Sequence, residues 1–192
     1  MELLENYERI TLERIDEILK LPNELELTYE ERKRDAYVGS LGQISRRFHR
    51  LPIAENWFAY SKALKSQGAI VAIEYKLPMI NTEVIPEDLV DFVLEHEATE
   101  CALSVNTQSR QNPLAVKKIR ELGLIGGVQV SRPKWNHAFA TVRQLRLAQR
   151  RGLLNKMISF ADDLELKPEN KRNAIGNQVL REAIFKLLTN AE

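Results

Sequence analysis

The spacing of apolar residues along the chain predicts a mostly helical fold. Residues 3–21 carry apolar side chains at helical intervals, and Pro22 ends that stretch. Thr28 and Glu31 have the spacing of a capping box, in which each side chain bonds the other residue's backbone amide at a helix start. The pattern before Gly68 therefore predicts three helices, at residues 3–21, 28 to about 50, and 54–66.

The pattern changes after Gly68, where β-branched residues dominate. The segment 69–75 is bounded by Gly68 and Pro78 and is the best strand signal in the chain. After Pro86, whose fixed φ suits a first helical turn, helical spacing returns. The sequence predicts a short strand at 80–85 and helices at 86–105, 113–122, 133–151, 153–166 and 168–189. It also predicts a polar loop at 106–112 and a glycine-containing connection at 123–131.

These elements predict a mostly α (α+β) fold with a small β element at about residues 69–85. The 192 residues suit one compact domain or a domain with a helical appendage. We expect an N-terminal helical region at 1–67, a central core at 68–152 and C-terminal helices at 153–192, together forming one compact unit.

Composition excludes several classes of protein. A hydrophobic content of 44% and a charged content of 29% are ordinary for a globular chain, and the net charge of +1 gives no overall attraction to nucleic acid or anionic membrane. The single cysteine, Cys101, cannot form an internal disulfide, and no stretch approaches the ~20 apolar residues that span a bilayer. The acidic start of the chain does not resemble a signal peptide, so we expect a cytoplasmic protein without a membrane partner.

Charge is unevenly distributed along the chain. From Glu83 to Glu100 there are seven acidic residues and no Lys or Arg, whereas from Asn112 to Lys156 there are ten basic residues and one acid. Two such segments can complement each other within one fold, or each can form a solvated face.

The one site-like motif is His96-Glu97-Ala98-Thr99-Glu100, in the predicted helix 86–105. At 3.6 residues per turn, His96 and Glu100 lie about 40° apart, in the middle of the apolar stripe of that helix. A carboxylate there is costly to bury unless it is paired, hydrogen-bonded or bound to a metal. Glu97 lies at the edge of the apolar stripe. A metal bound to His96 and Glu100 would leave a coordination position open beside Glu97, and a general base is needed at that position.

The motif resembles the HExxH helix of zincin-type metallohydrolases, with Glu100 where the second histidine of that pattern stands. The resemblance covers about residues 69–151: a strand, a loop, the His-Glu-x-x-Glu helix and a later helix that could return a third ligand. The layout is also similar to short phage-type and bacterial proteins with an HExxE helix and a downstream histidine. It implies a zincin-like core at 68–152 and a hydrolase of peptide or amide bonds that uses a metal-bound water, or a degenerate form of one.

His137 is the preferred third ligand. The near face of its predicted helix carries small residues that would allow close approach to another helix, whereas His49 lies in a basic cluster that would repel a cation. The nitrogen and oxygen donors favour zinc, so we predict zinc on His96, Glu100 and His137, with Glu97 as the base. The prediction requires the three ligands to converge within ligand distance; the alternative is a hydrogen-bonded i,i+4 pair of His96 and Glu100 in a helical core.

A nucleic-acid-binding function competes with this hypothesis. Arg143, Arg146 and Arg150 share one helix face and could contact phosphates, with Trp135 and Phe139 nearby to stack on bases. A solvated basic face explains the same pattern, and no recognised nucleic-acid motif accompanies it.

A protein-interaction function is the third possibility. It would use the predicted N-terminal helices, with Trp57 and Phe58 as the contact residues, although both aromatics also suit a core or an interface. Cys101 lies about 100° from Glu100 around the helix axis, so we expect it to be a small core hydrophobe and not a ligand or nucleophile.

Overall fold

The computed structural model describes residues 23–52, 55–108, 134–167 and 174–189. Helices dominate this part of the chain and three strands form one small sheet, which confirms the mostly α (α+β) fold. Within the same residues, no helix is both long and apolar enough to cross a membrane. The predicted helices at 3–21 and 113–122, the connection at 123–131 and the start of the predicted helix 168–189 lie outside the described residues.

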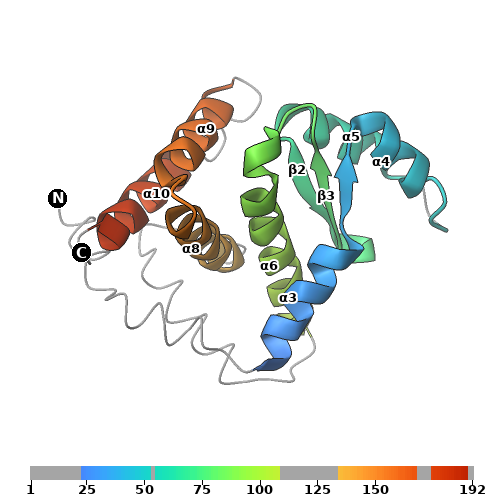
Figure 1. Cartoon of the computed structure of the whole chain (residues 1–192). Coiled ribbons are helices and arrows are strands. Elements are labelled where there is room, and N and C mark those ends of the chain that lie inside the picture. Colours follow the sequence, from blue (N-terminus) through green and yellow to red (C-terminus); the bar gives the residue numbers. More distant parts are fainter. Residues whose placement is uncertain (1–22, 53–54, 109–133, 168–173, 190–192) are drawn as a thin grey trace.

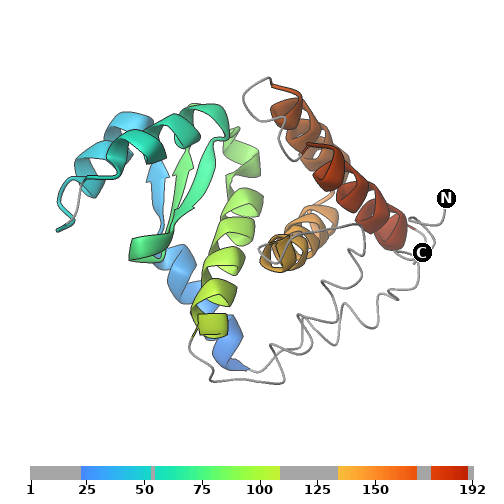
Figure 2. The ribbon, with the colours of Figure 1, turned by 180° about the vertical axis from the view of Figure 1, so that it is seen from behind.

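The elements lie in layers on either side of a central helix, α6 (Val90–Gln108), as Figures 1 and 2 show. One side holds the sheet, formed by β1 (Tyr37–Gly39), β2 (Ala69–Ala72) and β3 (Leu77–Asn81), and beyond it α4 (Leu41–Phe48) and α5 (Trp57–Ser66). The other side holds α8 (Lys134–Arg150), α9 (Leu154–Leu166) and α10 (Ala174–Thr189). Helix α3 (Asn23–Asp35) packs along α6, and two short 3-10 turns, η1 (Ile73–Tyr75) and η2 (Glu87–Leu89), complete the described elements.

The sheet has the strand order β1-β3-β2. β1 runs parallel to β3, with Val38 opposite Ile80, and β2 runs antiparallel to β3, with Val71 opposite Pro78. The strand predicted at 69–75 ends at Ala72, and the one predicted at 80–85 lies earlier, at 77–81. Pro78 therefore sits inside the central strand instead of marking a boundary. Since β1 pairs with β3, one strand of the predicted N-terminal region belongs to the same sheet as two strands of the central core.

The single helix predicted from Thr28 to about Arg50 is wrong. Thr28 lies inside α3, which ends at Asp35, and the strand β1 separates α3 from α4. The capping box of this region belongs to α4: Gln43 N donates to Ser40 Oγ at 3.3 Å, and Ser40 N donates to Gln43 Oε1 at 2.8 Å. β1 has only three residues and acquires its strand structure from β3, far along the chain, so local periodicity could not reveal it.

Most of the later helix boundaries are confirmed. α5, α6, α8 and α9 match the helices predicted at 54–66, 86–105, 133–151 and 153–166, although α6 extends to Gln108 into the predicted polar loop. Gly152 closes α8 with a φ of 70°, in the left-handed region that glycine adopts without strain. Gly68 has a φ of 80°, and a Cβ there would lie 2.5 Å from Ile85 Cδ1. Gly68 therefore lets the chain turn into β2 in close contact with the core.

Two groups of buried side chains stabilise the molecule. The larger group surrounds α6 and includes Phe92, Leu103 and Phe139, and the smaller lies between the sheet and the helices α4 and α5. Trp57 packs against the smaller group, whereas Phe58 is 82% exposed. Of the two aromatics predicted as partner contacts, Trp57 thus belongs to the fold and Phe58 lies at the surface.

Candidate metal centre

Helix α6 supplies two of the predicted ligands. Leu89, Phe92 and Leu103 are fully buried, and His96 lies among them with only 8% exposure. The side chain of Glu100, one turn further along, is half-buried. The predicted placement of His96 and Glu100 within the apolar stripe of this helix is therefore confirmed.

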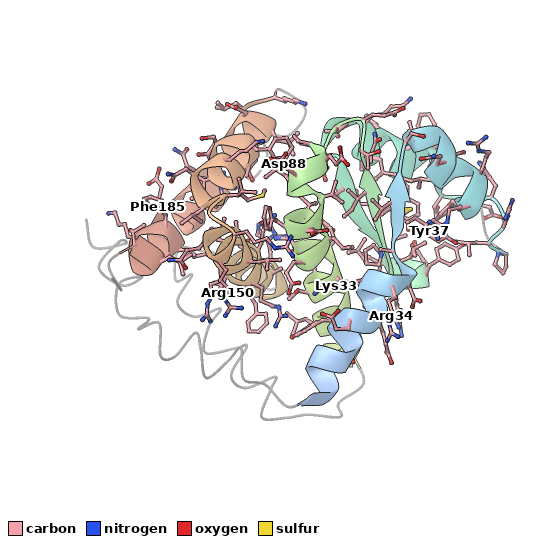
Figure 3. The ribbon with its side chains drawn as sticks, in the orientation of Figure 1. Lys33, Arg34, Tyr37, Asp88, Arg150 and Phe185 are labelled. Atoms are coloured by element: carbon pink, nitrogen blue, oxygen red, sulfur yellow. The ribbon has the colours of Figure 1, made fainter. Side chains whose placement is uncertain are left out.

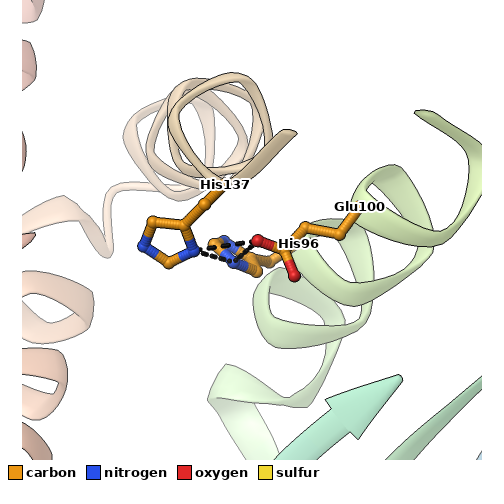
Figure 4. Close-up of side chains that lie close together, drawn as sticks. All are labelled: His96, Glu100 and His137. Atoms are coloured by element: carbon orange, nitrogen blue, oxygen red, sulfur yellow. Dashed lines mark hydrogen bonds and ion pairs between the residues drawn. The ribbon is translucent and has the colours of Figure 1, made fainter. Parts of the chain in front are cut away.

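Helix α8 supplies the third predicted ligand and packs directly against α6. Ala140, Thr141 and Ala148 are buried, which agrees with the expectation that the small-residue face of this helix allows a close approach. His137 stands near the start of α8, and its half-buried side chain points toward His96 and Glu100 (Figure 4).

The three side chains converge on one point, as the metal hypothesis requires. His137 Nδ1 lies 2.9 Å from Glu100 Oε1 and 3.1 Å from His96 Nε2, and His96 Nε2 lies 3.5 Å from Glu100 Oε1. Zinc bonds of about 2.0–2.1 Å with tetrahedral angles place neighbouring ligand atoms about 3.3 Å apart. The sides of this triangle bracket that value. Among the described residues, this is the one group of three His, Cys, Asp or Glu side chains with the geometry to hold a metal ion.

The contacts within the triangle set the direction in which the pKa of Glu100 shifts. Burial by itself would raise the pKa of Glu100, but the hydrogen bonds and charges of His137 and His96 outweigh it and hold that pKa below its ordinary value. The facing ring nitrogens of the two histidines can form a hydrogen bond only if one of them carries a proton. His96 Nδ1 is buried and has no hydrogen-bond partner within the described structure. The described polar contacts of that ring are therefore made through Nε2, the atom at the triangle.

Glu97 borders the triangle on the side of a cavity. His96, Glu97 and His137 all line this cavity, whose volume is about 300 Å³. Burial, and then the negative charge of Glu100, raise the pKa of Glu97 well above its ordinary value. The residue predicted as a general base thus shares one open space with two of the three predicted ligands.

Glu95, which the sequence reasoning did not single out, forms a second buried cluster. Its carboxylate accepts hydrogen bonds from Arg143 Nε at 2.7 Å and Nη2 at 2.6 Å, and it also contacts Lys33 Nζ. The Arg143 guanidinium lies 4.4 Å from the centroid of the Tyr29 ring. Burial would raise the pKa of Glu95, but Arg143 and Lys33 outweigh it and lower that pKa. The signal that could have found Glu95 was the opposite charge of the two segments to which Glu95 and Arg143 belong.

The predicted nucleic-acid face is only partly exposed. Phe139 is 1% exposed, so the prediction that it could stack on bases is wrong. Arg143 is turned inward to Glu95, Arg146 is half-buried, and Arg150 is exposed on α8 (Figure 3). The helix wheel placed Phe139 and Arg143 opposite the small residues, but α8 also contacts other helices and is covered on more than one side. The side chain of Trp135 lies outside the described residues.

The acidic and basic segments complement each other within the fold, which was one of the two expected arrangements. Besides Glu95 with Arg143, Asp91 Oδ2 pairs with Arg151 Nη1 at 2.6 Å, and Asp88 pairs with Lys156. Figure 3 places Asp88 at the end of the molecule where α6 begins, across from α9. The ion pairs therefore connect α6 and the turn η2 before it with α8, α9 and the turn between them.

The two residues not chosen as ligands, His49 and Cys101, are not part of the triangle. His49 follows α4, on the far side of the sheet from α8, with its ring centroid 5.7 Å from that of Trp57. Cys101 is 1% exposed, and burial raises the pKa of its thiol to about 11. It is a small core residue, as expected.

Comparison with protein-family models, curated protein sequences and solved structures finds no match to this chain. The residues of the site come from two helices distant in sequence.

Proposed function

We propose that the protein is a zinc-dependent hydrolase of peptide or amide bonds whose metal is held by His96, Glu100 and His137. The observation that carries the proposal is the triangle of two ring nitrogens and one carboxylate oxygen, with sides of 2.9–3.5 Å. These are donor types that zinc takes in proteins, and catalytic zinc sites use three protein ligands and leave one position for water or substrate. His96 and His137 also line the cavity, so a substrate can approach the open position from there.

The residues around the triangle suit the hydrolysis of an amide. Zinc, when bound, supplies Lewis acidity that polarises the carbonyl and lowers the pKa of a water molecule. Glu97 would be ionised once bound zinc offsets the Glu100 charge that raises its pKa, and it would then accept a proton from the attacking water while the new C–O bond forms at the carbonyl carbon. Glu97 then returns the proton to the amine nitrogen as the C–N bond breaks. The products are one carboxylic acid and one amine, and Glu97 is regenerated.

The alternative interpretation, in which His96 and Glu100 are a hydrogen-bonded i,i+4 pair in a helical core, accounts for less of the geometry. The His96–Glu100 contact is the longest side of the triangle, at 3.5 Å, and the two shorter sides both involve His137 from another helix. A core pair also gives no reason for Glu97 and a cavity to lie beside it. A nucleic-acid function has less support, because Arg143 is engaged by Glu95 and Phe139 is buried.

The test is zinc-dependent hydrolysis of a mixed library of internally quenched peptides. We expect the zinc-loaded protein to cleave members of the library, a chelator to stop the cleavage and added zinc to restore it. Glu97→Gln should retain zinc but cleave at least about 100-fold more slowly, since it removes the general base. Glu87→Gln, which neutralises an exposed acid before α6, is the matched control and should cleave like the wild type. A zinc-loaded wild type without cleavage, or a Glu97→Gln variant with full activity, would contradict the proposal.

A further inference from the structure

The cavity beside the triangle has a mixed lining, with polar side chains on part of its wall and a continuous set of apolar side chains on another part. Its volume of about 300 Å³ is at the lower end of the range for small-molecule sites, which suits a single side chain better than a large ligand. His96, Glu97 and His137 form one part of the wall. The apolar part comes from the end of the β3–α6 connection, from α6 and from α9: Ile85, Val93, Met157, Phe160, Ala161 and Leu164.

Gln144 is a polar residue of the cavity wall with hydrogen-bonding capacity to spare. It lies two helical turns after His137 on α8 and is 8% exposed. Its amide nitrogen contacts Met157 Sδ at 3.8 Å, a long contact to a weak acceptor. By contrast, the nearby Thr141 hydroxyl donates to the His137 carbonyl oxygen at 2.7 Å. The Gln144 amide can therefore bond an amide group of a bound molecule without breaking a strong contact.

The charged residues at the cavity do not favour an anionic ligand. Arg181 lines the cavity, but its Nε donates to Asp162 Oδ1 at 3.0 Å and its Nη2 to Glu165 Oε2 at 2.8 Å. Two carboxylates thus meet one guanidinium. An acidic side chain that enters the cavity would lose its hydration, and the charge of Arg181 is already balanced by the two carboxylates.

We propose that this cavity binds an uncharged apolar side chain, of the size of leucine or methionine, next to the amide that is cleaved. The assignment rests on the proposed hydrolase function and specifies its substrate class. The apolar wall buries the side chain, and the Gln144 amide bonds the adjacent backbone amide of the substrate. Substrates with aspartate or glutamate at this position are excluded.

Binding of three N-acetylated amino-acid hydroxamates to the zinc-loaded full chain tests the assignment. The probes carry the side chain of leucine, alanine or aspartate and the same metal-chelating group, so differences in affinity report on the cavity. We expect calorimetry to give a leucine probe bound at least about tenfold more tightly than the alanine probe, with the aspartate probe weakest. Equal affinities, a reversed order or no binding to zinc-loaded protein would overturn the assignment.

Two substitutions on α9 locate the effect. Ala161→Phe fills the cavity and should abolish the preference for the leucine probe while leaving the zinc content unchanged. Ser159→Phe adds the same ring at an exposed position of that helix and should keep the preference. A folded, zinc-loaded Ala161→Phe protein that retains the preference for the leucine probe would overturn the assignment. If this variant does not fold, the order of affinities of the wild type for the three probes tests the assignment.

The zinc content of each sample separates the two proposals. A wild type that takes up no zinc contradicts the proposed function, and the assignment of the cavity falls with it. A zinc-loaded wild type that cleaves peptides but does not discriminate among the probes contradicts the cavity assignment alone.

Discussion

Two buried charged clusters begin at neighbouring residues of α6 and differ in what balances their carboxylates. Glu95 meets Arg143 and Lys33, both permanently charged at neutral pH. Glu100 meets His96 and His137, whose rings are positive only when protonated. The first cluster carries its own counter-charge and needs no further partner. The second places three donor atoms around one point and offers them to a proton or a metal ion.

The two clusters also differ in what they connect. The Glu95 cluster joins α6 to both α3 and α8, whereas the triangle joins α6 to α8 alone. Arg143 lies on the same helix as His137, so the Glu95 cluster helps to fix the separation at which the triangle forms. A structural cluster of ion pairs thus lies beside a candidate site and supports its geometry.

The largest predicted effect separates the two carboxylates by their contribution to stability. Glu95→Gln should lower the free energy of unfolding by about 3 kcal/mol, because it leaves Arg143 and Lys33 without their anion in a buried position. Glu100→Gln should cost less than Glu95→Gln in metal-free protein, because a histidine can lose its proton when the carboxylate is removed, whereas Arg143 and Lys33 stay charged. Urea denaturation in the presence of a chelator measures both. Equal losses would mean that the two clusters do not differ as described.

The pH dependence sharpens the same prediction. Arg143 and Lys33 hold the pKa of folded Glu95 below its ordinary value, so its stabilising contribution is present above the unfolded pKa of about 4.3 and is lost as the pH falls through the folded value. The stability difference between wild type and Glu95→Gln should be complete at neutral pH and should narrow in acid. A difference of the same size at about pH 2–3 as at pH 7 would contradict this origin.

A smaller effect is predicted where the same two charged segments meet at the surface. Asp91 and Arg151 pair at 2.6 Å, but both side chains are exposed. Arg151→Ala should therefore lower the free energy of unfolding by no more than about 1 kcal/mol, and by less at high salt. Chemical denaturation at two salt concentrations measures the change. A loss comparable to that of Glu95→Gln would show that burial does not separate these pairs.

The parts predicted correctly from the sequence depend on local spacing. Helical angles placed His96 and Glu100 in one stripe, and the small residues after His137 indicated that its helix packs closely. Those two local signals were sufficient to anticipate the convergence of the three side chains. The general helical character and the boundaries of α5, α6, α8 and α9 follow from the same kind of pattern.

The parts predicted wrongly depend on contacts between distant segments. Strand β1 exists because it pairs with β3, and Phe139 is buried because α8 is covered on more than one side. A helix wheel gives the side of a helix on which a residue lies but not the number of neighbours around that helix. For the same reason the role of Glu95 depended on α3 and α8 and could not be read from α6 alone.

The central claim is that His96, Glu100 and His137 together hold one metal ion. Elemental analysis of untagged protein, purified without chelator, tests it most directly. We predict one zinc per chain in the wild type and in Glu97→Gln, and none in His96→Ala or His137→Ala, each verified as folded by circular dichroism. A stable wild type without metal, or a His137→Ala variant that retains a full equivalent of zinc, would contradict the three-ligand site.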